Sequence, residues 1–144
     1  MKIELLDGCM PVRANPTDAG LDLHSAEELI LRIGESRVVR CGFKMQLDKG
    51  MEAQIRTRSG MAAKNQVVVL NSPGTVDEGY RGEIMVILAN LGPQPYTINK
   101  GDRIAQMVIA KVEYPNIEEG KVLGSTDRGD KGFGSTGVKK EAAK

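Results

Sequence analysis

Short runs in which apolar and polar residues alternate extend along most of the chain. Alternation with a period of two is typical of a strand that buries one face. Gly, Pro, Asn or Asp stands between most of the runs, and short strands separated by such turn formers favour a β-sandwich or a β-barrel. The predicted strands cover residues 2–6, 21–25, 29–33, 36–47, 51–60, 67–71, 83–90 and 96–112.

One segment departs from this strand pattern. Residues 59–66, SGMAAKNQ, contain Ala and Met, which favour helix, over a length that allows about one or two turns. We predict a single short helix there.

The strands at 67–71 and 83–90 are predicted to pair as a hairpin. The connection between them, SPGTVDEGYRG, holds Pro and three Gly residues as turn formers. If the arms pair around Glu78, Asn71 faces the region of Met85, and Val76 faces Tyr80. Such a connection is long for a hairpin, and long loops held by rigid strands often carry function.

The last part of the chain has a different composition. From about residue 113 the apolar density falls, and such a segment buries too little surface to offset its ordering entropy. We predict a folded core over 1–124 and a flexible C-terminal arm over 125–144. The arm nevertheless contains Phe133, although the chain has no Trp, two Phe and three Tyr.

Charge and cysteine content narrow the classes of partner. The chain has 20 basic and 19 acidic residues mixed along its length, for a net charge of +1. This balance argues against a nucleic-acid-binding arm or a patch for anionic membranes. No apolar run approaches the roughly 18 residues of a membrane span, and the first residues lack a signal-peptide core. Cys9 and Cys41 are expected as free thiols, so a cytoplasmic protein is expected, or one in the host cytoplasm if the source is viral or phage.

The long loop contains the first candidate for chemistry. Asp77 would serve either as a turn residue that caps its own backbone or as a general base that takes a proton from water. Tyr80 would be either a core ring with a solvated hydroxyl or a platform for a flat ligand. Asn71 and Arg81 lie close to both in sequence.

Two further segments offer polar groups suited to an anion. In RTRSG, Arg58 and Ser59 stand at the start of the predicted helix, where they form either an anion site or an ordinary Ser cap. Gln106 lies in an otherwise apolar strand, and its amide needs a structural or a ligand partner. His24 is the only histidine, so neither a usual zinc site nor a Ser/His/Asp triad is supported.

Together these segments resemble the motifs of the homotrimeric deoxyuridine triphosphate nucleotidohydrolases (dUTPases), in the order of that family. The motifs are AGLDL (19–23), RSGMA (58–62), NSPGTVDEGYRGE (71–83), GDRIAQMVI (101–109) and RGDKGFGSTG (128–137). The third and fifth are long and specific. The resemblance implies a jelly-roll-like fold (a distorted β-barrel) and a homotrimer with active sites shared between subunits.

The resemblance also implies the reaction. A dUTPase hydrolyses dUTP to dUMP and pyrophosphate with Mg²⁺ bound by the triphosphate, which limits uracil in DNA and supplies dUMP for dTTP synthesis. Asp77 matches the residue that orients and deprotonates the attacking water. Tyr80 matches the ring beneath deoxyribose that leaves no room for a 2′-hydroxyl. Asn71, Val76 and the backbone near Met85 match the surface that binds uracil.

The remaining matches concern the phosphates and the arm. Arg58, Ser59 and Gly60 match the block that holds the phosphate chain, and Gln106 a phosphate contact from a neighbouring subunit. No direct protein ligand to the metal is implied, and Asp22 matches an acidic residue near the metal's water shell. In the arm, Phe133 with Gly134 matches the ring stacked over uracil. Arg128 matches a catalytic cation on the phosphates, and Ser135 with Thr136 matches a clamp on the γ-phosphate.

Two alternatives stay open at this stage. A dCTP deaminase-like enzyme would share the fold but has to explain why Asp77, Tyr80 and the arm match the hydrolase. A nucleotide-sensing regulatory binding protein would bind dUTP tightly with negligible turnover.

Overall fold

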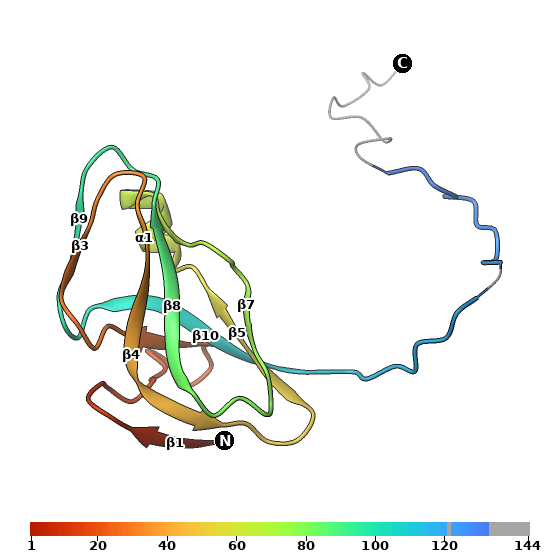
Figure 1. The fold of residues 1–144 in the computed structure, drawn as a ribbon, viewed down its shortest axis with the longest axis horizontal. Helices are drawn as coiled ribbons and strands as arrows, with labels where there is room; N and C mark the ends of the chain where they lie inside the picture. The colour runs from red at the N-terminus through yellow and green to blue at the C-terminus, as the bar shows by residue number, and fades with distance from the viewer. Residues whose placement is uncertain (121, 133–144) are drawn as a thin grey trace. The chain divides into compact units, whose positions relative to one another are not determined.

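Two four-stranded antiparallel sheets make up most of the first unit, Met1–Glu113, of the computed structural model, which describes residues 1–120 and 122–132 (Figure 1). The first sheet has the order β1-β4-β8-β6 and consists of Lys2–Leu5, Ser36–Gln46, Glu83–Asn90 and Val67–Val69. The second has the order β2-β10-β5-β7 and consists of Gly20–His24, Arg103–Lys111, Met51–Arg56 and Gly74–Val76. A two-stranded sheet pairs β3 (Leu29–Leu31) with β9 (Tyr96–Ile98).

The predicted all-β fold with one short helix is confirmed. Within the described residues the sheets are open at their edges and do not close into a barrel. β4 and β8 lie side by side in the first sheet, and β10 forms the middle of the second between β2 and β5 (Figure 1). No helix of the described residues is both long and apolar enough to cross a membrane.

The core is aliphatic apart from Phe43, as the scarcity of aromatic residues requires. Strand alternation places every second side chain inward: in β2, Leu21 and Leu23 are buried while Asp22 is only half-buried. The fully buried side chains come from both large sheets and the small one, and the largest of them are Phe43, Leu23, Leu31, Ile84, Leu88, Ile98, Ile104 and Met107. The same alternation that builds the core therefore leaves Asp22 on the opposite face of its sheet.

The predicted helix is present as α1, Ser59–Asn65. Met61 anchors it in the core, and it ends at Gln66, which adopts a left-handed conformation with φ 55°. Arg58 occupies the N-cap position without a side-chain capping bond, so of the two alternatives for this segment the ordinary Ser59 cap is wrong.

The hairpin predicted over 67–90 forms only in part. β6 pairs with the end of β8, with Val67 opposite Asn90 and Val69 opposite Leu88. The returning segment, β7, leaves this ladder and pairs with β5 in the other sheet, where Val76 stands opposite Ala53. The long connection therefore bridges the two sheets, and this difference shapes the site described below.

The run predicted over 96–112 is divided between two sheets. A turn between β9 and β10 is closed by the Asp102 carboxylate, which accepts a hydrogen bond from the Asn99 backbone N–H at 2.8 Å. Gly101 supplies the positive φ of 89° that this turn requires.

The second unit begins at Tyr114. Its described residues, 114–120 and 122–132, contain no helix or strand. Two consecutive turns lie in this part: the Gly129 N–H bonds to the carbonyl of Thr126 at 3.0 Å, and the Lys131 N–H bonds to the carbonyl of Arg128 at 3.2 Å.

Candidate functional site

A polar cleft of about 370 Å³, here called the cationic cleft, opens beside β2, the start of α1 and β10. It brings together the predicted residues Asp22, Arg58, Ser59, Gly60 and Gln106. The rest of its lining is Ala14, Asp18, Ala19, Gly20 and Arg103. Three motifs that lie far apart in sequence therefore meet at one place.

Asp22 organises the charges of the cationic cleft. Its carboxylate, only 14% exposed, accepts from Arg58 Nε at 3.0 Å and from Arg103 Nη1 at 3.3 Å. Arg58 also donates from Nη1 to the Arg103 backbone carbonyl at 3.4 Å. Asp18 and Asp22 balance the two guanidinium groups in formal charge. The guanidinium groups nevertheless keep N–H donors that the Asp22 carboxylate does not use, and such donors suit an anionic ligand.

Strand pairing explains how these residues meet. In the middle of the second sheet, Gln106 stands opposite Asp22 on one side and Arg56 on the other. The Gln106 amide donates from Nε2 to the Thr57 carbonyl at 3.0 Å, which joins β10 to the start of the helix. Gly20 leaves room for this amide, because a Cβ there would lie 2.5 Å from Gln106 Oε1.

His24 lies next to the cleft, and both burial and the charges of the cleft act on its imidazole. Burial lowers the pKa of its imidazole; Asp22 opposes this shift, and Arg103 and Arg58 add to it. Its Nδ1 is buried and has no hydrogen-bond partner among the described residues. We therefore expect His24 to be neutral at pH 7.

A second cleft, of about 290 Å³ and here called the loop cleft, lies over the end of the long connection and the start of β8. It brings together the predicted residues Val76, Asp77, Tyr80 and Met85. The other residues of its lining are Val38, Thr75, Glu83, Ile84 and Ile87. The lining is mostly apolar and includes the Asp77 carboxylate and the Tyr80 phenol ring. Such a surface suits a flat ligand of low charge.

Hydrogen bonds fix the loop that carries Asp77. The Tyr80 N–H bonds to the Asp77 carbonyl at 3.1 Å, and Arg81 Nη1 donates to the carbonyls of Glu78 and Tyr80 at 2.7 and 2.8 Å. The Glu78 carboxylate accepts from the Gly50 N–H at 2.7 Å, which ties the loop to the turn before β5. The Asp77 side chain is exposed, so water has access to its carboxylate.

Not every predicted residue joins these clefts. The amide of Asn71 packs against Gly74, where a Cβ would lie 3.0 Å from Asn71 Nδ2, and it lines neither cleft. Arg128 belongs to the second unit, where its Nε donates to the Lys131 carbonyl at 3.1 Å. The predictions for Phe133, Gly134, Ser135 and Thr136 lie outside the described residues.

Sequence reasoning missed several lining residues of the clefts, and the two that matter most for the contacts described here are Arg103 and Glu83. Arg103 lies within the GDRIAQMVI motif, and its charge in an otherwise apolar strand was an available signal. Its pairing with Asp22, 81 residues away, became visible only with the register of β2 and β10. Glu83 ends the third motif and lines the loop cleft, but its position next to turn formers gave no indication of a role.

The donor set does not form a direct metal cage. No group of three or more His, Cys, Asp or Glu side chains that could hold a metal is present in residues 1–120 and 122–132. Mg²⁺ usually keeps several waters and binds through one or two carboxylates plus substrate phosphates. In the cationic cleft, Asp18 and Asp22 stand beside the two arginines. This arrangement fits a metal that is bound mainly through phosphate oxygens and water.

Comparisons with known proteins agree with the sequence motifs. Residues 7–137 match the family model described as dUTPase. The deoxyuridine 5'-triphosphate nucleotidohydrolase of Clostridium acetobutylicum is 50% identical over 142 residues, which cover 97% of this chain and 98% of that protein.

Two solved structures extend the comparison to the fold. A point mutant of the Staphylococcus bacteriophage 80alpha dUTPase, solved with dUpNHpp, matches with a TM-score of 0.89 at 28% identity over 95% of this chain and 98% of that one. A point mutant of the dUTPase from phage phi11 of S. aureus, whose structure reveals the coordination of a structural Mg(II) ion, matches with a TM-score of 0.79 at 26% identity over 86% of this chain and 98% of that one.

Proposed function

The chain belongs to the dUTPase family and is a dUTP diphosphatase, and we propose that Asp77 activates the water that hydrolyses dUTP to dUMP and pyrophosphate. The observation that carries this mechanism is the loop cleft, in which an accessible carboxylate stands beside a phenol ring on a loop fixed by hydrogen bonds. Triphosphate hydrolysis needs a positioned water and stabilisation of charge more than it needs covalent chemistry.

The proton and bond changes balance around Asp77. Its carboxylate takes a proton from water, the water oxygen attacks the α-phosphorus, and the bond from the α-phosphorus to the oxygen that bridges it to the β-phosphorus breaks. Pyrophosphate leaves with the bonding electrons, and dUMP keeps the new oxygen. A positioned base of this kind typically contributes a factor of about 10²–10⁴ in rate.

The loop cleft binds the nucleoside half of the substrate. Tyr80 packs beneath deoxyribose, while Val76 and the backbone at Met85 contact uracil. The apolar lining supports this assignment. Asn71 reaches the uracil edge from the end of β6 after a change of its side-chain position. A methyl group at C5 of thymine would meet the cleft wall, which excludes dTTP.

The cationic cleft binds the triphosphate. Arg58, Ser59, Gly60 and Gln106 contact phosphate oxygens there, and the two guanidinium groups around Asp22 support this role. When Mg²⁺ is bound it neutralises phosphate charge, and Asp22 lies near its water shell. Arg58 and Gln106 hold the phosphate chain in line for attack.

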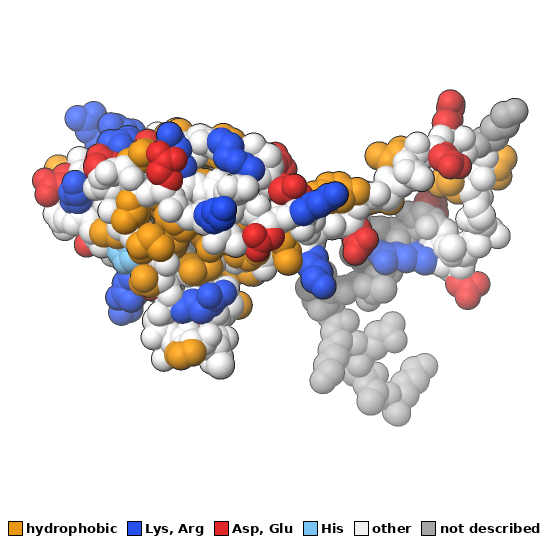
Figure 2. All heavy atoms as spheres, turned by 90° about the horizontal axis from the view of Figure 1, so that it is seen from below, with side chains coloured by type: hydrophobic (Ala, Val, Ile, Leu, Met, Phe, Trp, Pro, Cys, Tyr) orange, Lys and Arg blue, Asp and Glu red, His pale blue; other side chains and the backbone are white. Residues whose placement is uncertain are grey.

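The active form is a homotrimer whose sites combine clefts from different subunits. Two observations support this: the clefts share no lining residue, and apolar side chains outside both clefts, such as Ile30, Leu70 and Leu91, are more than half exposed. Figure 2 shows hydrophobic side chains gathered on the surface among interspersed acidic and basic ones. Exposed apolar area of this kind is typical of surfaces that bind another protein.

The segment over 125–144 acts as an arm that closes over bound nucleotide. Arg128 supplies a cation to the phosphates, Phe133 with Gly134 covers uracil, and Ser135 with Thr136 holds the γ-phosphate. The glycine-rich fifth motif supports this proposal, because backbone freedom lets a segment wrap closely around a ligand.

In the cell the reaction limits uracil in DNA and supplies dUMP.

A direct assay tests the proposed function. Pyrophosphate release is measured with dUTP, dTTP, dCTP and UTP, each with Mg²⁺ and with EDTA. We expect rapid release from dUTP with Mg²⁺ and far slower release in every other arm. The nucleotide products are also identified, and dUTP binding is titrated separately. Conversion of dCTP to dUTP would favour the deaminase-like alternative, and tight dUTP binding without pyrophosphate release would favour a sensing protein.

A further inference from the structure

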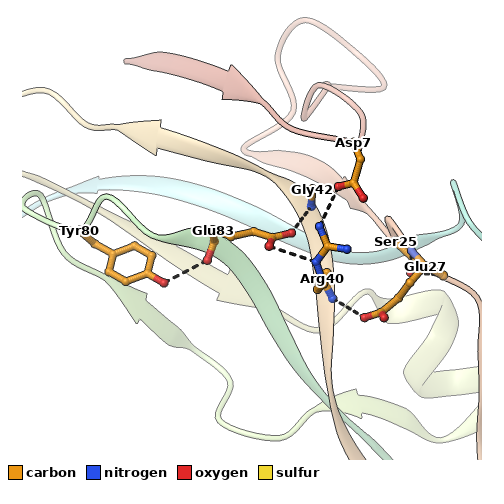
Figure 3. Close-up of polar contacts among 7 residues, drawn as sticks. All are labelled: Asp7, Ser25, Glu27, Arg40, Gly42, Tyr80 and Glu83. Carbon is orange, nitrogen blue, oxygen red and sulfur yellow. Dashed lines mark hydrogen bonds and ion pairs between the residues drawn. The ribbon is translucent and has the colours of Figure 1, made fainter.

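A bulge in β4 lies beside the first residue of β8, next to the loop cleft (Figure 3). The register shifts there: Arg40 stands opposite Met85 and Lys44 opposite Glu83. β4 therefore has extra residues between these pairs, and the extra residues lack the usual ladder partners on β8.

The peptide groups of Gly42 in this bulge find other partners. Its carbonyl accepts from the N–H groups of Leu6 and Gly8 at 2.9 and 3.1 Å. Its N–H donates to Glu83 Oε1 at 2.9 Å. Gly42 has a positive φ of 70°, and a Cβ there would overlap the backbone of Gly8, so only glycine fits. The Glu83 carboxylate thus replaces a missing strand partner.

The other oxygen of the same carboxylate is also engaged. Arg40 Nε donates to Glu83 Oε2 at 3.1 Å, and Arg40 Nη2 donates to Asp7 Oδ1 at 2.9 Å (Figure 3). The Arg40 backbone N–H donates to Glu27 Oε1 at 2.8 Å. The Glu83 side chain is only 18% exposed, and both oxygens of its carboxylate are held by hydrogen bonds.

The backbone of Glu83 in turn holds the ring of Tyr80. The Tyr80 hydroxyl donates to the Glu83 carbonyl at 3.0 Å. The Tyr80 ring lies against Gly82, where a Cβ would be 2.5 Å from Tyr80 Cζ. The Tyr80 residue is 42% exposed, so it retains a surface for a ligand while its hydroxyl end is anchored.

We propose that Glu83 is a positioning residue for substrate specificity, whose clamped carboxylate holds the carbonyl that fixes Tyr80 against the sugar. This inference rests on the proposed function, in which Tyr80 leaves no room for a ribose 2′-hydroxyl. Replacing the Glu83 side chain removes neither the carbonyl nor the ring. Because Glu83 also lines the loop cleft, a variant that combines its loss with Tyr80→Phe is needed to separate a shift of the Tyr80 ring from a lost contact of Glu83 with the ligand.

The experiment compares kcat/KM for dUTP with kcat/KM for UTP in Glu83→Ala, Tyr80→Phe and the double variant. We expect the dUTP/UTP ratio to fall about tenfold in each single variant, as for the loss of one hydrogen bond. The double variant should fall no further, because both changes break one connection. Glu83→Gln, which keeps an acceptor for Gly42 but loses the charge facing Arg40, should fall less.

Glu4→Gln is the matched control. Glu4 lies on β1 opposite Lys44 of β4, and its carboxylate pairs with the Lys44 amine at 3.7 Å. It makes no side-chain bond to Gly42 or Arg40, so loss of its charge should leave the dUTP/UTP ratio unchanged. Unfolding in urea is measured for every variant, and Glu83→Gln serves as the test if Glu83→Ala does not fold.

Three results would overturn the inference. The first is a wild-type ratio in the Glu83 variants with only their stability lowered. The second is a fall in the double variant equal to the product of the single effects, and the third is an equal fall in Glu4→Gln. A wild-type protein that does not hydrolyse dUTP would instead refute the proposed function, and this inference with it.

Discussion

The cationic cleft and the loop cleft are built in opposite ways. The cationic cleft combines three distant segments around the largely buried carboxylate of Asp22, and its lining is rich in charged groups. The loop cleft comes mainly from one continuous stretch, residues 75–87, and its lining is mostly apolar. A nucleoside triphosphate has the same division between a flat, uncharged base and an anionic chain. Neither cleft alone suits both halves, so the proposed site uses both clefts, and whether they come from one copy of the chain or from two is tested below.

The largest expected effect is in the loop cleft, from Asp77→Asn. The amide keeps the shape of the side chain but cannot take a proton from water, so turnover should fall about 10²–10⁴-fold while nucleotide still binds. Single-turnover hydrolysis of dUTP and a separate titration with a non-hydrolysable analogue distinguish the two quantities.

Asp48→Asn is the control for this substitution. Asp48 is an exposed carboxylate that pairs with the N-terminal amine at 2.9 Å and lines neither cleft. It should retain full turnover. Near-normal turnover in Asp77→Asn would show that the loop cleft does not supply the base.

The next effect tests whether the clefts of one site come from different subunits. Asp77→Asn damages only the loop cleft, and Arg58→Gln only the cationic cleft. If the two proteins are unfolded together and refolded as mixed trimers, about a quarter of the sites combine an intact cleft of each kind, because the two contributing subunits are drawn independently. We expect activity well above that of either parent.

The outcome for a self-contained chain is different. If each chain formed a complete site, every chain in the mixture would carry one damaged cleft, and mixing would restore nothing. Wild-type protein carried through the same unfolding and refolding gives the scale, and sedimentation reports the number of subunits.

The two clefts also differ in how much of each the sequence predicts. Val76, Asp77, Tyr80 and Met85 are close in sequence, so a single loop motif was enough to group them. Asp22 and Arg58 were identified one by one from their motifs, but their ion pair depends on sheet register, which alternation alone does not determine.

The fold shows the same limit. Alternation located the strands because it reports which face of a strand is buried. It did not show that Gly74–Val76 leaves the hairpin for the other sheet, since a three-residue strand is too short to show a period. Nor did it show the bulge at Gly42, whose partners are the side chain of Glu83 and the backbone of Leu6 and Gly8.

The smallest expected effects come from adding one methyl group to each cleft. In Gly82→Ala the new Cβ would overlap the rigid ring of Tyr80, which has to swing away. In Gly20→Ala the new Cβ meets only the Gln106 side chain, with Oε1 at 2.5 Å and Cβ at 3.3 Å, and the overlapping amide can rotate away. Displacement of the ring should lower the dUTP/UTP ratio of kcat/KM, and displacement of the amide should weaken inhibition by pyrophosphate, each by roughly two- to tenfold.

Each variant serves as the control for the other, because Gly82→Ala should change only the dUTP/UTP ratio and Gly20→Ala only the inhibition by pyrophosphate. If both variants changed both readouts equally, the clefts would not act as independent halves, and the division of base and phosphate recognition between them would be wrong.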